Sequence, residues 1–337
     1  MNVRVLASPF TPRRLVLTAA LAALAASVGS ALAQNAKSSF PQRPLRYITA
    51  SEPGGAGDIV ARLLSPDLSA ILGVQVVVDN RPGAGNTIGA ELAARSVPDG
   101  HTIFGCNIAS LAVSPALYRK PGYDPERDFA PVGLIASNPN VLSVHPAVPV
   151  TTVANFIELA KSNPGKLNYA SAGVGTSPQL SMELFRMQAG INIVHIPYKG
   201  VGSALVDLIG GRVDAMFSTV PSLISSYRSG RVRVLAVTST ARDPDMPDVP
   251  TVAESGMPGF EVISWQGLCT PAGVPPPHQA KIRHALTAAL ARPDTRKRFV
   301  DQAFQINPMP AEEFAAYIRS ERAKWAKVVK DSGIEPR

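Results

Sequence analysis

Apolar residues along the chain recur with two alternating periods, which indicates strands followed by helices. Short β-branched and apolar runs predict strands, and segments with an apolar residue every three or four positions predict amphipathic helices. In the first third of the chain, the pattern predicts strands at 44–49, 74–78 and 102–105 and helices at 59–72 and 88–95. Asp58 is placed to cap the first helix, and Pro66 is expected to kink it.

The same alternation returns in the middle of the chain. It predicts strands at 167–171, 193–197, 213–218 and 232–237 and helices at 178–188 and 203–209. An extended run at 260–268 precedes two further helices, at 280–290 and 312–330, and the aromatics of the last helix are expected in the core. Strands that alternate with helices of these lengths favour an α/β fold with a parallel sheet.

The length and the hydrophobic content of 45% predict two lobes, because about 300 residues exceed what one core comfortably holds. The segments that flank the middle α/β unit are too short to be separate domains. We therefore expect a discontinuous lobe one at 41–135 and 263–337, and lobe two at 136–262. Two chain crossings, near Ile135 and Ile263, would form a hinge, with a ligand cleft at the carboxyl ends of the strands.

The first 33 residues have the pattern of a secretory signal peptide. Arginines precede an apolar run from Leu15 to Leu32 that closes on Ala31-Leu32-Ala33, so cleavage is expected before Gln34. No later run approaches the roughly 20 residues needed to cross a bilayer. We therefore expect a periplasmic protein.

Charge and cysteine usage narrow the range of partners. Removing the leader takes away three Arg and no acid, so the formal charge falls from +8 to +5. The remaining basic residues are scattered and only 6% of residues are aromatic, which argues against nucleic acid as a partner. Only Cys106 and Cys269 are present, and a disulfide and two free thiols both remain open.

No catalytic or cofactor motif assembles from the sequence. The sequence lacks the His-Glu-x-x-His motif of zinc proteases, the Gly-x-Ser-x-Gly motif of hydrolases, a phosphate-binding Gly-Lys-Ser/Thr loop and a Cys-x-x-Cys pair. Its five His are scattered along the chain. The glycines at 83–89 come too late after a strand for a dinucleotide fingerprint, so a turn explains them better. We therefore expect no catalytic residue, no metal and no cofactor.

Two glycine-rich loops, 54–58 and 173–177, each join a strand to the start of a helix. Glycine lets backbone N–H groups approach a ligand, and the positive end of a helix favours an anion. The alternative is a pair of tight turns in which Asp58 and Ser177 are plain helix caps. Because Pro178 suits the first helical position, we expect Ser177 to cap and Thr176 to contact the ligand.

An ordered series of short motifs covers nearly the whole mature chain. They are Pro44-Leu45-Arg46, Pro53-Gly54-Gly55-Ala56-Gly57-Asp58, Asp79-Asn80-Arg81-Pro82-Gly83-Ala84-Gly85, Pro98-Asp99-Gly100, Tyr169-Ala170-Ser171, Gly175-Thr176, Pro197-Tyr198-Lys199-Gly200, Leu235-Ala236-Val237-Thr238-Ser239 and Pro247-Asp248-Val249-Pro250-Thr251. Together they resemble the Bug family, the substrate-binding proteins of tripartite tricarboxylate transporters.

This resemblance implies a two-lobed type II periplasmic-binding-protein fold that closes around a small organic carboxylate, held by loop amides and ordered waters. It implies transporter subunits as partners and no cofactor, and we expect a monomer. The expected ligand-binding residues are Ser51, Glu52, Gly55, Ala56, Gly57, Asp58, Ser171, Gly175, Thr176, Ser177, Tyr198 and Lys199, with Gly200 beside them. Lys199 could equally be a solvated surface charge.

The sequence departs from the family pattern at two places. Ser51, with Glu52 beside it, stands where the family commonly has an aromatic, and Gln179 stands where it commonly has a His. Glu52 either points to solvent or binds a positively charged or hydrogen-bond-donor group at the far end of the ligand. The second alternative predicts a carboxylate with a further polar feature.

Two rival functions remain at this point. An exported enzyme acting on a small carboxylic acid would use Asp58 or Ser171 as acid or nucleophile, but no His lies beside either loop in the sequence. A receptor that serves a membrane sensor kinase would keep the binding site and change only the partner.

Overall fold

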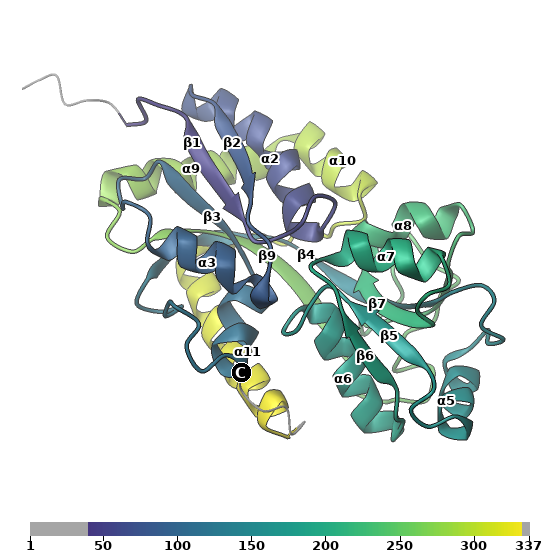
Figure 1. The fold of residues 1–337 in the computed structure, drawn as a ribbon. Coiled ribbons are helices and arrows are strands. Elements are labelled where there is room, and N and C mark those ends of the chain that lie inside the picture. The colour runs from purple at the N-terminus through teal and green to yellow at the C-terminus, as the bar shows by residue number, and fades with distance from the viewer. Residues whose placement is uncertain (1–39, 332–337) are drawn as a thin grey trace, which may run out of the picture. The chain divides into compact units, whose positions relative to one another are not determined.

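Ten strands form one mixed sheet in the computed structural model, which describes residues 40–331 (Figure 1). Along its main path the order is β2-β1-β3-β9-β4-β7-β5-β6, and β8 and β10 each pair with β4. The predicted signal peptide and its cleavage site lie outside the described residues. No helix within 40–331 is both long and apolar enough to cross a membrane.

The first section of the sheet is built on three parallel strands. They are β1 (Leu45–Thr49), β2 (Val76–Asn80) and β3 (Thr102–Asn107). Antiparallel β9 (Ile263–Pro271) pairs with β3 and with β4 (Phe129–Val144), and β10 (Met309–Pro310) pairs with β4. The helical segments of this section are α2 (Ala56–Leu72), η1 (Ala84–Asn86), α3 (Thr87–Ala94), η2 (Ala109–Val113), α4 (Ser114–Leu117), α9 (Pro276–Ala291), α10 (Pro293–Asp301) and α11 (Ala311–Asp331). Helix α2 packs against α9 and α10, and α11 packs against β4.

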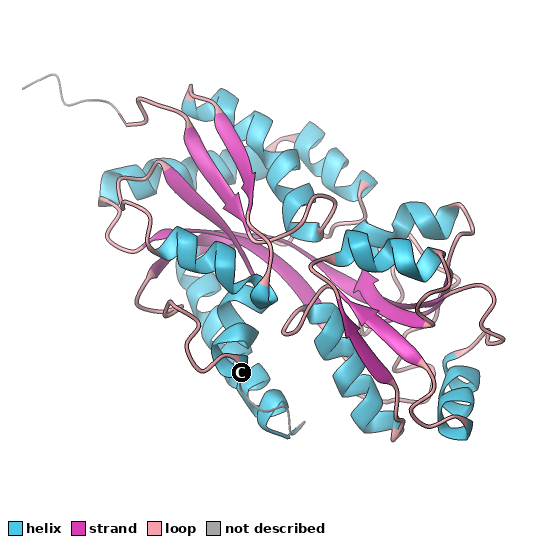
Figure 2. Cartoon of the chain, viewed as in Figure 1, coloured by secondary structure: helices cyan, strands magenta, loops and turns pink. Residues whose placement is uncertain are grey.

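The second section combines parallel and antiparallel pairing. Strand β5 (Asn168–Ser171) pairs in parallel with β6 (Val194–Pro197) and β7 (Ala215–Thr219), while β7 and β8 (Arg233–Val237) run antiparallel to β4. Its helices are α5 (Val153–Ser162), α6 (Ser177–Ala189), α7 (Val201–Ile209) and α8 (Val220–Arg228). Figure 2 shows these helices flanking the strands.

Strands β4 and β9 link the two sections. Residues 129–139 of β4 pair with β9, and residues 140–144 pair with β7. The chain therefore passes from one section to the other inside a continuous strand, close to Asn140. The crossing expected near Ile135 lies within the same strand, and the return expected near Ile263 lies at the start of β9.

The helix starts differ from the sequence-based expectation at both glycine-rich loops. Helix α2 begins at Ala56 with Gly55 as its N-cap, so Asp58 lies in the first turn and is not the cap. Helix α6 begins at Ser177 with Thr176 as its N-cap, so the prediction that Ser177 caps this helix is wrong. Helix α2 runs on through Pro66 without interruption.

Aromatic residues fill the core on the two sides of the crossing strands. In the second section, Phe185, Phe217 and Phe260 pack with ring centroids 6.0–6.4 Å apart. In the first section, the centroid of Trp265 lies 5.5 Å from that of Phe314. Trp325 and Phe314 are fully buried, so the aromatics of α11 belong to the core as expected.

The two cysteines lie on neighbouring strands, β3 and β9. Both are fully buried, and their Sγ atoms are 2.8 Å apart. They are free thiols in this structure, and burial raises the pKa of Cys106.

Candidate ligand-binding site

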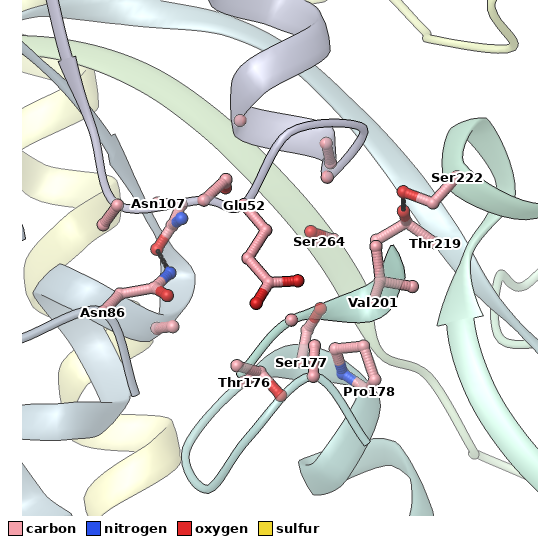
Figure 3. A pocket seen from close by; sticks show the side chains of 18 of the residues that line it. Glu52, Asn86, Asn107, Thr176, Ser177, Pro178, Val201, Thr219, Ser222 and Ser264 are labelled. Carbon is pink, nitrogen blue, oxygen red and sulfur yellow. Dashed lines mark hydrogen bonds between the residues drawn. The ribbon is translucent and has the colours of Figure 1, made fainter. Parts of the chain in front are cut away.

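A cavity of about 70 Å³ is lined by residues from both sections of the sheet (Figure 3). The first section and β9 contribute Ala50, Ser51, Glu52, Gly55, Ala56, Gly57, Asn86, Asn107, Ile108, Ala109, Ser264 and Gln266. The second section contributes Ala172, Thr176, Ser177, Pro178, Lys199, Gly200, Val201, Thr219 and Ser222. Most lining residues are small, about half are polar, and Glu52 and Lys199 are the charged ones.

Five helices begin at this cavity, and the N-cap of each lines it. The helices are α2, α3, α6, α7 and α8, with N-caps at Gly55, Asn86, Thr176, Gly200 and Thr219. None of these five caps makes a side-chain cap hydrogen bond, whereas Thr152 caps α5 by accepting from the backbone N–H of Asn155. The positive ends of five helices therefore meet at the cavity, which suits an anion.

The first glycine-rich loop is held from beneath by Asp58. This buried carboxylate accepts hydrogen bonds from the backbone N–H of Gly54 (2.9 Å), from Nδ2 of Asn80 (2.9 Å) and from Nε of Arg62 (2.8 Å). Nδ2 of Asn80 also donates to the carbonyl of Ser51 at 2.9 Å. Asp58 thus fixes the loop and does not line the cavity.

Gly57 is required by the close approach of its neighbours. A Cβ added there would lie 2.5 Å from Oγ of Ser51 and 3.0 Å from Oγ1 of Thr49. A larger residue at this position would therefore displace the Ser51 side chain at the cavity wall.

The second glycine-rich loop is held by its own side chains. Oγ1 of Thr176 donates to the carbonyl of Gly173 at 2.7 Å, and the N–H of Gly175 donates to Oε1 of Gln179 at 3.2 Å. Gln179 is buried and does not line the cavity. The departure from the family pattern at this position therefore affects the support of the loop.

Ser171 lies next to His195, a histidine that is distant from it in the sequence. Pairing of β5 with β6 brings Nε2 of His195 to 2.7 Å from Oγ of Ser171, and the ring of His195 stacks on Tyr169. Ser171 is fully buried and does not line the cavity. The pair therefore joins two strands within the second section.

Tyr198 faces a neighbouring hollow. Its hydroxyl donates to Oδ2 of Asp207 at 2.7 Å, a hydrogen bond that raises the pKa of Tyr198 and lowers that of Asp207. Tyr198 lines a hollow together with Tyr118 and Gly173. Lys199 is exposed and lines both this hollow and the main cavity.

Most of the residues expected at the site lie together. The main cavity is lined by Ser51, Glu52, Gly55, Ala56, Gly57, Thr176, Ser177 and Lys199, as well as Gly200. Asp58, Ser171, Gly175 and Tyr198 are absent from its lining. Whether any of these residues contacts a ligand stays a prediction.

Several lining residues had not been expected from the sequence. Asn107 and Thr219 end parallel strands β3 and β7, so the rule that α/β folds bind ligands at strand carboxyl ends could have found them. Ser264 and Gln266 carry no such signal, because antiparallel β9 brings them in at its start. Within residues 40–331, no cluster of three or more His, Cys, Asp or Glu could hold a metal ion.

Comparison with solved structures defines the class of protein. The fold matches an R. palustris protein solved with adipate at a TM-score of 0.86 and 34% identity, covering 88% of this chain and 100% of that one. It matches the periplasmic binding protein BugD at a TM-score of 0.85 and 35% identity, with 88% and 100% covered. It matches MatC from Rhodopseudomonas palustris, solved with bound malate, at a TM-score of 0.81 and 33% identity, covering 86% of this chain and 100% of that one. The fold is therefore that of a periplasmic binding protein.

Sequence comparison then gives the family. Residues 60–334 match the profile described as tripartite tricarboxylate transporter family receptor, and the chain belongs to this family. It is 39% identical over 308 residues to a UPF0065 protein in the tcbD–tcbE intergenic region of Pseudomonas sp. strain P51, with 91% of each chain covered. It is 34% identical over 297 residues to BugT of Bordetella pertussis, covering 88% of this chain and 91% of BugT. The resemblance to the Bug family is confirmed.

Proposed function

We propose that this chain captures a small organic carboxylate in the cavity and delivers it to a tripartite tricarboxylate-type membrane transporter from the periplasm. The observation that carries the proposal is the convergence of five helix N-termini whose caps make no side-chain hydrogen bond. Such helix ends hold a carboxylate through backbone N–H groups and need no arginine. Similarity to proteins solved with adipate and with malate supports the same ligand class.

In this proposal the two sections are lobes that close on the ligand. Lobe one comprises 41–135 and 263–337, and lobe two comprises 136–262. The cleft is bridged by Oγ of Ser222, which donates to the carbonyl of Gly54 at 3.3 Å, and by Oγ of Ser203, which lies 3.5 Å from Oε2 of Glu52. A ligand that contacts helix ends of both lobes stabilises the closed form, which the transporter then recognises.

Binding without turnover is part of the proposal. The carboxylate of Asp58 already accepts three hydrogen bonds beneath its loop, and buried Ser171 is absent from the cavity lining although His195 lies beside it. That neither side chain lines the cavity supports binding without turnover.

A thermal-shift screen of the mature protein tests this function. The panel contains straight-chain mono- and dicarboxylates, aromatic acids and amino acids, each beside its primary amide as a control without the charge. An acid at about one hundred times its Kd adds about 2.7 kcal/mol to the free energy of unfolding and raises Tm, while its amide does not. Mass spectrometry of the recovered ligand checks turnover. A chemically altered acid at catalytic rate, or no acid that raises Tm, contradicts the proposal.

A further inference from the structure

Glu52 reaches from the first glycine-rich loop into the cavity. Figure 3 shows its side chain directed toward Ser177 and Val201, which belong to the opposite section. Oε2 of Glu52 lies 3.5 Å from Oγ of Ser203, whose hydroxyl also lies 3.1 Å from the carbonyl oxygen of Gly200. A Cβ added to Gly200 would lie 2.5 Å from Cδ of Glu52, so the carboxylate lies directly against the backbone there.

The place that the Glu52 carboxylate occupies is suited to an anion. Gly200 is the N-cap of α7 and makes no side-chain cap hydrogen bond, and Ser203 lies in the first turn of this nine-residue helix. Across residues 40–331, no Lys, Arg or His forms an ion pair with Glu52. Helix α7 thus meets a carboxylate that the protein itself supplies.

We propose that Glu52 takes the place of the second carboxylate of a dicarboxylate ligand, so that this cleft selects acids with a single carboxylate. The inference rests on the proposed function and names the ligand class of the same site. The ends of α2, α3, α6 and α8 remain for the one carboxylate of the ligand. A second ligand carboxylate at α7 would meet the like charge of Glu52, which is strongly unfavourable in a partly buried cavity.

The Glu52 side chain also takes up part of the cavity. A volume of about 70 Å³ remains beside the Glu52 side chain. The same side chain thus excludes a second carboxylate by both charge and volume, and two substitutions separate these effects. Glu52→Gln removes the charge and keeps the shape, whereas Glu52→Ala removes both.

The test is calorimetry on the whole mature protein with acids matched in carbon number. Butanoate is compared with succinate and hexanoate with adipate, and 4-aminobutanoate is a third arm. The wild type is expected to prefer the monocarboxylate of each pair by at least roughly tenfold, because a like charge opposes the second carboxylate. Glu52→Ala is expected to reverse the preference, and Glu52→Gln to reduce it. The control Glu158→Gln, an exposed position on α5, is expected to leave it unchanged.

Other results of the calorimetry would contradict either the inference about Glu52 or the proposed function. A wild type that prefers the dicarboxylates, or an unchanged preference in Glu52→Ala, overturns the inference and leaves the proposed function standing. If Glu52→Gln weakens the binding of 4-aminobutanoate alone, Glu52 binds the cationic group of the ligand and the inference is wrong. If no acid binds the wild type or any variant, the proposed function itself fails.

Discussion

Thr176 and Ser177 are neighbours at the cavity with different hydrogen-bond partners. Oγ1 of Thr176 donates to the carbonyl of Gly173, which also accepts from the backbone N–H of Thr176 at 3.3 Å. Oγ of Ser177 donates to Oδ1 of Asn140, at 3.3 Å, inside the crossing strand β4. Asn140 is fully buried, so this second contact matters more for stability.

We therefore expect substitution of Thr176 to affect mainly ligand affinity and substitution of Ser177 to affect mainly stability. Thr176→Val puts a methyl group at the cavity wall while the Gly173 carbonyl keeps its backbone partner, so ligand affinity falls with a loss of stability below about 1 kcal/mol. Ser177→Ala leaves the buried Oδ1 of Asn140 without its hydrogen bond and costs about 1–3 kcal/mol. Calorimetry and urea unfolding measure the two effects. A larger stability loss for Thr176→Val contradicts this assignment.

Asp243 makes the free energy of unfolding depend on pH, and its contribution to stability falls as pH rises. It is buried, its Oδ1 accepts from the N–H of Asp245 at 2.9 Å, and burial raises its pKa, with the charge of Asp245 acting in the same direction. A raised folded-state pKa favours folding while the group is protonated, and this contribution is lost as pH rises through that pKa.

Asp243→Asn is therefore expected to gain stability relative to the wild type as pH rises. The amide keeps the acceptor oxygen and has no charge to bury. The difference in Tm between variant and wild type should widen from about pH 3 to about pH 7, where an ordinary Asp is fully ionised. Thermal unfolding followed by circular dichroism measures it. A difference that stays constant with pH would show that the charge of Asp243 is not responsible.

Local sequence patterns predicted both glycine-rich loops but assigned the wrong residues as helix caps. Glycine before a helix is a local signal, so both loops could be predicted. Thr176 is the cap of α6 because the helix begins one residue earlier than the position of Pro178 suggests. Gln266 could not be predicted, because pairing between β9 and β3 sets it opposite Asn107, far away in the sequence.

Helix α11 supports β9, the strand whose residues Ser264 and Gln266 line the cavity. Oε2 of buried Glu321 accepts from Nε1 of Trp265 on β9 (3.2 Å) and from Nε1 of Trp325 (3.1 Å). Trp265 lies between Ser264 and Gln266, which both line the cavity. One carboxylate thus ties the C-terminal helix to the crossing strand from the side opposite the ligand site.

Glu321→Ala is expected to cost about 2–4 kcal/mol, because it leaves two buried indole N–H groups unpaired. Glu321→Gln keeps an acceptor oxygen and should cost about 1 kcal/mol. Urea unfolding followed by tryptophan fluorescence measures both variants. Equal losses for Ala and Gln would mean that packing, and not the hydrogen bonds, accounts for the effect.

Most strands and helices could be predicted from periodicity, and the long strand β4 could not. Residues 129–144 contain Pro131 and Pro139, which ordinarily argue against an interior strand. Pro131 lies at a shift in register, and Pro139 lies where pairing with β9 ends. These positions depend on strands more than one hundred residues away, so no local rule shows that they tolerate proline.

Strands β4 and β9 join the two sections, and contacts of Ser222 and Ser203 bridge the cleft between them. The bridging contacts of Ser222 and Ser203 are at the long end of the hydrogen-bond range, at 3.3 and 3.5 Å. Such contacts close the cleft only weakly without a ligand. Closure should therefore follow ligand binding, and a side chain too large for the closed cleft should oppose it.

Ser222 allows a direct test of closure because it lies in the first turn of α8, against the carbonyl of Gly54. Ser222→Trp fills the closed cleft and is expected to lower ligand affinity by at least roughly tenfold, about 1.4 kcal/mol. Its radius of gyration should not fall when ligand is added, whereas that of the wild type should. Ser222→Ala removes the same hydrogen bond without adding bulk, and we expect it to contract on ligand addition as the wild type does. Small-angle scattering with and without ligand gives the answer. A Ser222→Trp protein that contracts as the wild type does would mean that the sections do not close on each other at this point.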